Sequence, residues 1–432
     1  MPSKIAVVGC GYVGLTTGAC FAHIGHEVVC ADIDTERVAG LQRGEIPIVE
    51  PGLDNIVREA MSDGRLKFVV GAASAVGGAE FVYLCVPTPM RFDGSADLSY
   101  IEAAAREIGP VLEAEAVVVN KSTVPVGSTS VVEQVLGRDD VFVVSNPEFL
   151  REGSAVHDFL HPDRIVIGAD NQAAAIRVQA LYLGITAPTI VTDPASAETI
   201  KYAANSFLAA KISFVNALAA VCEAVGADMN DVVLGVGYDK RIGSEFLRPG
   251  PGWGGSCLPK DTRALIRIAE EAGYDFDLLR GVVAVNEQQL DRVAEKAATL
   301  AGGSLRGKRV GVWGLTFKAR TDDLRESPAL AVVRRLLGAG AEVRAFDPTV
   351  ANPIDPHKAR ALEGIDVVGD PYAACEDAEV LLVLTEWEEF RWLDFDKAGA
   401  ALAARRVVDA RNLLDRDAMR RKGFEYEGIG RR

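Results

Sequence analysis

The chain has 432 residues, of which 49% are hydrophobic and 25% are charged, and its formal net charge at pH 7 is −15. This length corresponds to about three typical domains, and the apolar content is sufficient for a core in each. The acidic balance provides no general attraction to nucleic acid or to an anionic membrane surface, so neither partner is expected.

The first residues enter a strand and a glycine turn directly, without the charged, apolar and small-residue succession of a secretory signal. No apolar run is expected to reach the length of a membrane span. The seven cysteines form neither CxxC pairs nor a disulfide framework. These features predict a cytoplasmic, reduced protein without a bound metal.

The N-terminal part alternates between two sequence patterns from residue 4 to about residue 144. Short β-branched runs such as KIAVVG and HEVVCAD are separated by alanine-rich amphipathic stretches, and further extended runs follow at 163–170 and 186–194. This alternation predicts an α/β fold with a doubly wound parallel sheet. We expect this Rossmann domain to cover residues 1–195.

The middle part is predicted to be helical. Residues 195–226 contain no internal proline or glycine and are rich in helix formers, which predicts one long helix. At 1.5 Å per residue it would extend about 45 Å, enough to join two lobes and to offer a dimer surface. Helical patterns continue towards residue 300, so a helical middle domain is expected over 196–300.

The C-terminal part returns to strand and helix patterns after a glycine-containing break at 301–308. We expect a smaller Rossmann-like domain over 301–432. Its opening, KRVGVWGLTF, imitates the N-terminal strand and turn but lacks the GxGxxG motif. Two nucleotide-type domains joined by a helical connector imply two nucleotide ligands.

The N-terminal glycine motif points to a dinucleotide. Gly9, Gly11 and Gly14 follow the strand IAVV directly, and Asp32 ends the next strand, 18 residues after Gly14. Glycines at this spacing allow a tight turn and a close approach of a pyrophosphate, while an acid at that place accepts hydrogen bonds from an adenosine ribose. The acid favours NAD over NADP because it repels a 2′-phosphate. A purely structural glycine turn is the alternative.

Cys257 lies in the segment GPGWGGSCLPKD, just before a predicted helix whose first turn contains Pro259. A helix N-terminus and the nearby Lys260 both favour a thiolate. Taken alone, a cysteine in a glycine-rich loop is more often inert than catalytic, and Asp261 is more often a first-turn acid that complements the helix dipole. The other six cysteines lie in apolar contexts and are assigned to core packing.

Lys201 and Asn205 are four residues apart on the predicted long helix, and the same face continues with Leu208, Ile212 and Val215. Polar residues that head an apolar stripe are expected to point inward. A lysine at the solvated end of a helix is the alternative.

Four polar residues follow predicted strands, where ligands of open α/β sheets bind. They are Thr88, Thr123, Glu148 and Glu152. Each could instead cap a turn or lie in solvent.

Two basic, loop-like segments could hold a diphosphate or the cofactor. One carries Arg241 and Arg248, and the other carries Lys318, Arg320 and Arg325. Surface solvation is the alternative for any single one of these side chains.

Taken together, six segments resemble the UDP-glucose/GDP-mannose dehydrogenase family in the same order and at fitting intervals over essentially the whole chain. They are GCGYVG, CVPTP, KSTVPVG, NPEFLREG, DKRIGSEFLRPGPGWGGSCLPKD and FKARTDDLRES. The GGSCLPKD segment is highly specific. The loop that precedes it resembles the branch that acts on UDP-glucose more than the branches that act on GDP-mannose or N-acetylaminosugars.

The resemblance implies a role for each matching residue. The implied catalytic residues are Cys257, Lys201, Asp261, Asn205, Glu148 and Thr123. The implied cofactor contacts are Gly9, Gly11, Tyr12, Val13, Gly14, Asp32, Arg37, Thr88, Thr123, Glu152, Lys260 and Arg325. The implied substrate contacts are Phe149, Leu150, Arg151 (through its backbone only), Glu152, Lys201, Asn205, Arg241, Phe246, Leu247, Arg248, Gly254, Phe317 and Lys318.

The resemblance also implies a homodimer, in which Arg241 reaches the substrate of the other subunit, and a four-electron oxidation. The C6 hydroxyl of a UDP-hexose loses a proton as C6 gives a hydride to NAD, and Cys257 traps the aldehyde. Transfer of a second hydride to another NAD leaves a thioester that water hydrolyses. Three alternatives remain: the same chemistry on GDP-mannose or a UDP-N-acetylhexosamine, an ordinary two-electron dehydrogenase, and a non-catalytic nucleotide-sugar sensor.

Overall fold

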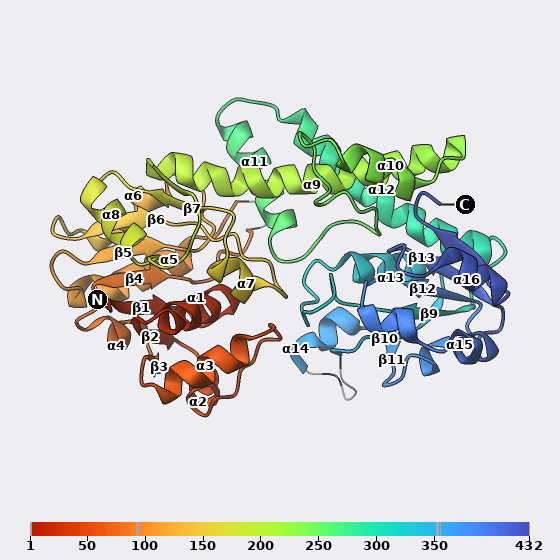
Figure 1. The fold of residues 1–432 in the computed structure, drawn as a ribbon, viewed down its shortest axis with the longest axis horizontal. Coiled ribbons are helices and arrows are strands. Elements are labelled where there is room, and N and C mark those ends of the chain that lie inside the picture. Colours follow the sequence, from red (N-terminus) through yellow and green to blue (C-terminus); the bar gives the residue numbers. More distant parts are fainter. Residues whose placement is uncertain (1, 92–94, 351–353, 355, 432) are drawn as a thin grey trace. The chain divides into compact units, whose positions relative to one another are not determined.

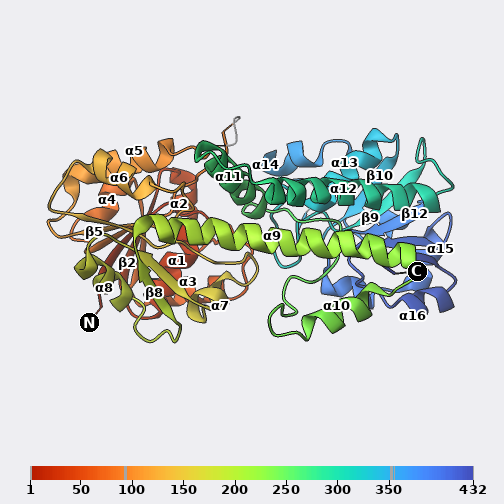
Figure 2. The ribbon, with the colours of Figure 1, turned by 90° about the horizontal axis from the view of Figure 1, so that it is seen from above.

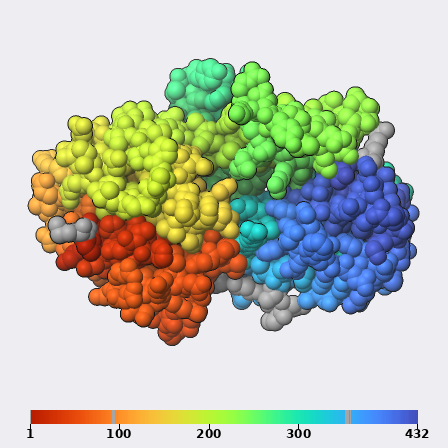
Figure 3. Space-filling view, in the orientation of Figure 1, coloured from red at the N-terminus to blue at the C-terminus, as the bar shows by residue number. Residues whose placement is uncertain are grey.

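The computed structural model describes residues 2–91, 95–350, 354 and 356–431, and the other residues are drawn in grey (Figures 1 and 3). It divides into two compact units. Unit 1 contains Met1–Ala204 and Arg263–Ala272, and unit 2 contains Asn205–Thr262 and Gly273–Arg432. The helical middle part therefore contributes residues to both units. The three-part division expected from the sequence stays a prediction.

Unit 1 is built on an eight-stranded sheet with the order β3-β2-β1-β4-β5-β6-β7-β8 (Figure 1). The strands are β1 (Lys4–Val8), β2 (Glu27–Asp32), β3 (Leu66–Val70), β4 (Phe81–Leu84), β5 (Val117–Asn120), β6 (Phe142–Ser145), β7 (Ile165–Gly168) and β8 (Thr189–Thr192). The first six in space are mutually parallel and bracket β1, as in a doubly wound fold.

The last two strands extend the parallel sheet that the sequence predicted for the first six. β7 lies antiparallel to β6, and β8 is parallel to β7. The connection from β6 to β7 contains only the short helix α7 (Ala155–Leu160), which packs on α1 (Tyr12–His23). Without a crossover helix to carry the chain back to the opposite edge, β7 runs in the reverse direction.

Helices cover both faces of the unit 1 sheet, and each face has its own apolar core. The remaining elements are α2 (Thr35–Gln42), α3 (Leu53–Ser62), α4 (Ala72–Val76), α5 (Ser99–Ile108), η1 (Gly109–Val111), α6 (Ser128–Leu136) and α8 (Gln172–Ala180). One core packs α1, α3, α7 and α8 on the sheet, and the other packs α4, α5 and α6. Strands buried on both faces explain why their sequences are continuous β-branched runs.

The predicted long helix is confirmed as α9 (Pro194–Val225), an unbroken helix of 32 residues (Figure 2). Within the described residues, it alone is long and apolar enough to cross a membrane, with a window of mean hydropathy 1.6 that is one-third buried. The expected absence of a membrane span therefore stays a prediction. Length and composition alone do not distinguish a span from a helix that packs between protein elements.

Unit 2 contains a six-stranded parallel sheet with the order β11-β10-β9-β12-β13-β14. The strands are β9 (Arg309–Trp313), β10 (Glu342–Phe346), β11 (Ile365–Val367), β12 (Val380–Val383), β13 (Arg406–Asp409) and β14 (Glu425–Gly428). The other elements are α10 (Met229–Gly237), α11 (Leu258–Glu271, whose C-terminal part belongs to unit 1), α12 (Asp277–Leu300), α13 (Pro328–Gly338), α14 (Pro356–Ala359), η2 (Arg360–Leu362), η3 (Ala373–Cys375), η4 (Glu388–Trp392), α15 (Phe395–Ala401) and α16 (Arg416–Arg421). The C-terminal part of α9, with α12 and α13, covers one face, and η3, η4, α15 and α16 cover the other.

The opening of the second sheet repeats that of the first, as the sequence predicted. Gly314 follows β9 with φ +90° and donates to the carbonyl of Phe346 at 2.8 Å, as Gly9 follows β1 with φ +99° and donates to that of Ala31 at 2.7 Å. However, the acid after β10, Asp347, is buried and accepts from its own chain. Its carboxylate accepts hydrogen bonds from the hydroxyls of Thr316 and Thr349 and from the indole N–H of Trp387. It is therefore not available to a ribose.

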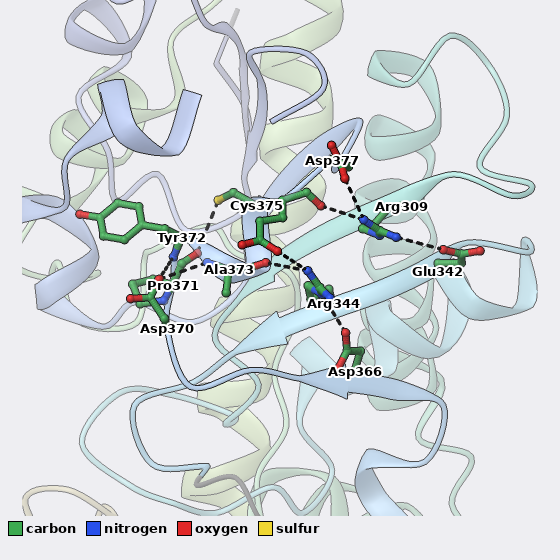
Figure 4. Close-up of polar contacts among 11 residues, drawn as sticks. Arg309, Glu342, Arg344, Asp366, Asp370, Pro371, Tyr372, Ala373, Cys375 and Asp377 are labelled. Carbon is green, nitrogen blue, oxygen red and sulfur yellow. Dashed lines mark hydrogen bonds and ion pairs between the residues drawn. The ribbon is translucent and has the colours of Figure 1, made fainter. Parts of the chain in front are cut away.

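A group of arginines on the second sheet is neutralised by its neighbours (Figure 4). Arg344 on β10 pairs with Asp366 at 2.7 Å, and Arg309 on β9 pairs with Asp377 at 3.5 Å. The acids are largely exposed, so each pair adds only about 0–1 kcal/mol of stability. This surface lacks the unpaired basic charge of an anion site.

Candidate active site

Two of the three glycines of the dinucleotide motif, Gly9 and Gly14, are required by the fold of unit 1. A side chain on Gly14 would overlap the carbonyl oxygen of Gly9, and one on Gly9 would lie 2.5 Å from the carbonyl oxygen of Cys85. Gly9 also has a positive φ, which disfavours other residues. These two glycines would be needed whether or not the turn binds a ligand.

Gly11 is different, because nothing in the chain requires a glycine there. Its φ of −73° is accessible to any residue, and a Cβ added to it would meet no atom within 4 Å. Gly11 is exposed and directly precedes the N-terminus of α1. The empty space in front of a helix N-terminus fits a pyrophosphate, so Gly11 distinguishes a nucleotide site from a structural turn.

We expect Gly11→Ala to weaken NAD binding at least about tenfold while leaving the melting temperature of the protein nearly unchanged, because the added methyl group occupies only ligand space. Gly14→Ala should instead lower the melting temperature by several degrees. Calorimetric titration with NAD and thermal unfolding measure the two effects. Equal destabilisation by both substitutions would show that Gly11 also has a structural role.

Asp32 ends β2 and anchors the turn. Its carboxylate accepts from the backbone N–H of Cys10 at 2.8 Å and of Asp34 at 3.0 Å, and the guanidinium of Arg37 lies 3.3 Å away. A carboxylate at this place accepts hydrogen bonds from ribose hydroxyls, and its negative charge repels a 2′-phosphate. The geometry thus agrees with the NAD preference predicted from the sequence.

Glu50 is a component of the cofactor region that the sequence reasoning missed. The hydroxyl of Tyr12, in the first turn of α1, donates to the Glu50 carboxylate. The backbone N–H of Gly153 donates to the same carboxylate oxygen at 2.7 Å. Burial and this acid raise the pKa of Tyr12. Glu50 thus ties the glycine turn to the loop that carries Glu152, and it had no recognisable signal in the sequence.

Thr88 and Thr123 come together after β4 and β5, as expected for residues at neighbouring strand ends. The Thr88 hydroxyl donates to the backbone carbonyl of Thr123 at 2.8 Å. The following loop is fixed by Glu198 on α9, which accepts from the N–H of Gly127 at 2.6 Å and from the Thr129 hydroxyl at 2.7 Å. Glu198 was not predicted to have any role.

Glu148 and Lys201 form a buried ion pair in unit 1, with 4% and 3% of their side chains exposed. The Lys201 ammonium donates to the carboxylate at 2.8 Å and to the Glu148 carbonyl at 2.7 Å. The N–H of Leu150 donates to the second carboxylate oxygen at 2.6 Å. Burial raises the pKa of Glu148, but the Lys201 charge and these hydrogen bonds hold it below its usual value. The inward orientation predicted for Lys201 is confirmed.

The segment after Glu148 is held by aromatic and ionic contacts within unit 1. The guanidinium of Arg164 stacks 3.6 Å from the ring centroid of Phe149, and the Arg151 side chain pairs with Asp158 at 2.6 Å. The Arg151 side chain is thus engaged within unit 1 by its pair with Asp158.

Unit 2 contains the predicted nucleophile. Cys257 directly precedes α11, and it alone of the seven cysteines is partly exposed. The backbone N–H of Asp261 donates to the Cys257 carbonyl at 2.9 Å, which fixes the residue at the start of the helix. Burial raises the pKa of Cys85 and of Cys375 to about 12. The partial exposure of Cys257 and its place before a helix N-terminus favour a thiolate there.

Asp261 lies on the first turn of α11, has no exposed surface and has both carboxylate oxygens in hydrogen bonds. The amide of Asn205 donates to one oxygen and the ammonium of Lys260 to the other, each at 2.6 Å. Asp261 is thus a buried acid that orients two hydrogen-bond donors. The sequence alone had left open that it only complements the helix dipole.

The glycines before Cys257 allow the loop 314–327 to approach closely. A side chain on Gly254 would overlap the carbonyl oxygen of Glu326, and one on Gly255 would lie 2.8 Å from the ring of Phe317. Arg411 donates to the Phe317 carbonyl at 3.1 Å. The thiol loop and the loop of Phe317 and Lys318 therefore form one packed assembly within unit 2.

The predicted basic residues lie at the surface of unit 2. Arg241 pairs with Asp239 at 2.6 Å, Arg325 pairs with Asp323 at 2.6 Å, and Arg248 is exposed. Leu247 is buried, whereas Phe246 adopts the uncommon φ of +63°. These placements leave the predicted substrate contacts of the loop untested.

The predicted site residues thus form two contact groups, one within each compact unit. Glu148 and Lys201 belong to unit 1, whereas Asn205, Lys260 and Asp261 belong to unit 2. Lys201 and Asn205 follow each other by one turn along α9. Within the described part of the chain, no group of His, Cys, Asp or Glu side chains could hold a metal ion.

The glycine turn and the acid after β2 define a dinucleotide-binding domain, and comparison with known proteins specifies the family. Three domain models of the UDP-glucose/GDP-mannose dehydrogenase family match the chain: the NAD binding domain at residues 3–186, the central domain at 195–288 and the UDP binding domain at 311–416. The chain belongs to this family.

Relatives match the chain over its full length. It is 47% identical to the UDP-glucose 6-dehydrogenase of Rhizobium meliloti, with 99% of each chain covered. It is 46% identical to UDP-glucose 6-dehydrogenase TuaD of Bacillus subtilis, with 99% of this chain and 93% of the relative covered. A solved UDP-glucose dehydrogenase from Pyrobaculum islandicum superposes with a TM-score of 0.91 at 40% identity, covering 100% of this chain and 98% of that one.

Proposed function

We propose that the protein oxidises UDP-glucose twice at C6 to UDP-glucuronate, with reduction of two NAD molecules. The assignment of UDP-glucose as the substrate is supported by the 47% and 46% identity to UDP-glucose 6-dehydrogenases over 99% of this chain. The observation that carries the reaction type is the partly exposed Cys257 at the N-terminus of α11, next to the turn that contains Asp261. A two-electron dehydrogenase has no need for such a thiol, and neither has a nucleotide-sugar sensor.

NAD, when bound, supplies the hydride acceptor for both oxidations. In the first, the C6 hydroxyl must lose a proton as the C6–H bond breaks, and we assign this proton to Asp261 or to a water molecule that it holds. Both oxygens of Asp261 already accept hydrogen bonds. Transfer of the proton through a water molecule therefore agrees better with the geometry of Asp261 than direct transfer to its carboxylate.

The aldehyde formed in this way cannot release a second hydride until a nucleophile has added to its carbon. The Cys257 thiolate forms the C–S bond, and the carbonyl oxygen becomes an oxyanion. The ammonium of Lys201 and the amide of Asn205 stabilise that oxyanion as donors. Loss of the second hydride turns the thiohemiacetal into a thioester.

Hydrolysis of the thioester completes the reaction, and we assign the activation of water to Glu148. A base must be unprotonated to act, and Lys201 keeps the pKa of Glu148 below its usual value. Water adds to the acyl carbon, its proton passes to the Glu148 carboxylate, and the thiolate of Cys257 leaves. The carboxylate product makes the sequence irreversible.

The stoichiometry of NADH tests this function. With UDP-glucose we expect two NADH for each substrate molecule consumed and no comparable rate with GDP-mannose, UDP-N-acetylglucosamine or UDP-N-acetylmannosamine. One NADH per substrate would indicate a simple alcohol dehydrogenase, and none with any sugar nucleotide would indicate a sensor. A faster reaction on another sugar nucleotide would keep the chemistry and reassign the substrate.

We also propose a homodimer that forms through α9. Phe207, Phe214 and Val221 are exposed and recur every seven residues, so they share one face of the helix. Tyr238, directly after α10, adds another exposed ring in the same unit. An apolar stripe of this kind is typical of an interface between copies. In such a dimer, Arg241 would reach the substrate of the other subunit.

Phe214→Glu is expected to convert the dimer into monomers at micromolar concentration, because it places a charge in the centre of the stripe. Sedimentation velocity measures the change. Tyr274→Glu is the matched control, since Tyr274 is equally exposed in unit 2 but does not belong to the α9 stripe. A wild-type monomer that floats with liposomes would instead assign the stripe to a membrane.

All seven cysteines are free, which agrees with a reducing compartment. We therefore retain the cytoplasm as the proposed location. Protein expressed in the source cell and fractionated with cytoplasmic and membrane markers tests this assignment.

A further inference from the structure

A buried acid, Glu50, joins two segments of unit 1 that lie far apart in the sequence. It directly precedes the turn that leads into α3, and 7% of its surface is exposed. Its Oε2 accepts hydrogen bonds from the Tyr12 hydroxyl and from the backbone N–H of Gly153, the latter at 2.7 Å. The same N–H lies 3.0 Å from the Tyr12 hydroxyl oxygen. The three groups therefore form a closed network.

The network alone fixes the position of the Glu50 carboxylate. Its other oxygen, Oε1, is buried and has no hydrogen-bond partner among the residues that the structure describes. Burial and the Glu50 carboxylate raise the pKa of Tyr12, so the hydroxyl stays protonated and remains a donor. Glu50 and Gly153 are both buried, so water does not replace a bond that is lost between them. A displacement of either donor is therefore transmitted to the other through the carboxylate.

One end of the network lies at the cofactor turn. Tyr12 is the first residue of α1 and directly follows Gly11, in front of which the space for a pyrophosphate is open. A pyrophosphate bound at this helix N-terminus holds the first turn of α1 in place. It thereby also holds the Tyr12 side chain that reaches Glu50.

The other end of the network lies on the segment 148–153. This segment begins at Glu148, whose carboxylate and carbonyl accept from Lys201 on α9 at 2.8 and 2.7 Å. It ends at Gly153, whose φ of +80° is typical of glycine. The segment is therefore held by α9 at one end and by Glu50 at the other. In the proposed function Glu148 acts at the reacting carbon, so the position of this segment affects the sugar nucleotide.

We propose that Glu50 is a positioning residue that couples the two ligands, so that NAD at the glycine turn and UDP-glucose beside Glu148 each bind more tightly when the other is present. The coupling is positive because both ligands favour the arrangement in which Tyr12 and Gly153 share one carboxylate oxygen. It is also reciprocal, since a coupling free energy acts equally on both ligands. The proposal rests on the proposed function for the identity and place of the sugar nucleotide.

Tyr12→Phe tests the coupling, because it detaches α1 from Glu50 and leaves the backbone of the turn unchanged. Calorimetry measures the dissociation constant of UDP-glucose for the free protein and for protein saturated with NADH, which accepts no hydride and so prevents turnover. We expect NADH to tighten UDP-glucose binding at least about fivefold in the wild type and less than about twofold in Tyr12→Phe. Tyr182→Phe is the matched control: it removes another buried hydroxyl of unit 1, which donates to Asn146 at 2.6 Å, and should keep the wild-type ratio.

Two variants of Glu50 separate coupling from general destabilisation. Glu50→Gln retains an acceptor oxygen and should keep most of the ratio, whereas Glu50→Leu should lower it, since Gly153 then keeps only the Tyr12 hydroxyl at 3.0 Å. Thermal unfolding is measured in parallel. A Glu50→Leu variant with a lower melting temperature but an unchanged ratio would show a structural role alone and overturn the proposal.

The wild type also distinguishes failure of this proposal from failure of the proposed function. A ratio near one in the wild type, or an unchanged ratio in Tyr12→Phe, would overturn the coupling while leaving the reaction intact. Absence of UDP-glucose binding to the wild type would instead overturn the substrate assignment. The ratio would then be measured with the sugar nucleotide that yields NADH, and the same two outcomes would decide the coupling.

Discussion

Cys257→Ser should abolish UDP-glucuronate formation, with a loss of more than about a thousandfold, because a serine hydroxyl at a helix N-terminus is not ionised near neutral pH. The variant can still exchange hydride between the alcohol and an added aldehyde slowly, since that step forms no bond to sulfur. Product formation is measured by chromatography of the sugar nucleotides and exchange by isotope transfer. Cys257 is partly exposed, so the substitution should leave the fold intact.

The matched control is Cys375→Ser in unit 2, where burial raises the pKa of the thiol to about 12 and the Sγ donates to the backbone carbonyl of Pro371 at 3.5 Å. It should retain activity, apart from a moderate loss of stability on burying a hydroxyl. Alkylation with iodoacetamide should modify Cys257 before the other cysteines, and the loss of enzyme activity should be proportional to the fraction of Cys257 that is modified. Full uronate production by Cys257→Ser would refute the covalent role.

Lys201→Met should slow both hydride transfers by about 10²–10³-fold, because each passes through an alkoxide-like state that an ammonium stabilises. The substitution also leaves Glu148 buried without its ion-pair partner, which costs about 3–5 kcal/mol of folding stability. Stopped-flow measurement of NADH separates the two transfers, and thermal unfolding reports the stability.

The double variant Lys201→Met/Glu148→Gln distinguishes catalysis from folding. It removes both charges and should recover most of the lost stability but none of the hydride transfer rate. Recovery of the rate together with stability would mean that Lys201 serves only to neutralise Glu148. An unaltered rate in Lys201→Met alone would remove Lys201 from the mechanism.

Much of the fold was predictable because its strands are buried on both faces and therefore appear as unbroken β-branched runs. The expected strands of both sheets and the helix α9 are confirmed. The direction of β7 was not predicted, because a sequence pattern records that a segment is extended but not which way it runs. The short strands β11 and β14 were also missed, since three or four residues carry too little pattern to recognise.

The candidate site was predictable where a residue type has a local reason. Cys257 precedes a helix and Gly11 lies in a spaced motif, so both could be singled out from the sequence. Glu50 could not, because its role arises from a contact with a residue far along the chain, Gly153. The catalytic roles drawn from the family resemblance stay predictions.

The covalent intermediate provides the most direct test of the proposed chemistry. Glu148→Gln should hydrolyse its thioester slowly, so acid quenching during turnover of UDP-glucose with NAD should trap an acylated protein. The account predicts a mass increase equal to a UDP-glucuronyl group, located by peptide mapping on Cys257 and removed by hydroxylamine. Formation of two NADH per UDP-glucose without any adduct on Cys257, in the wild type and in this variant, would contradict it.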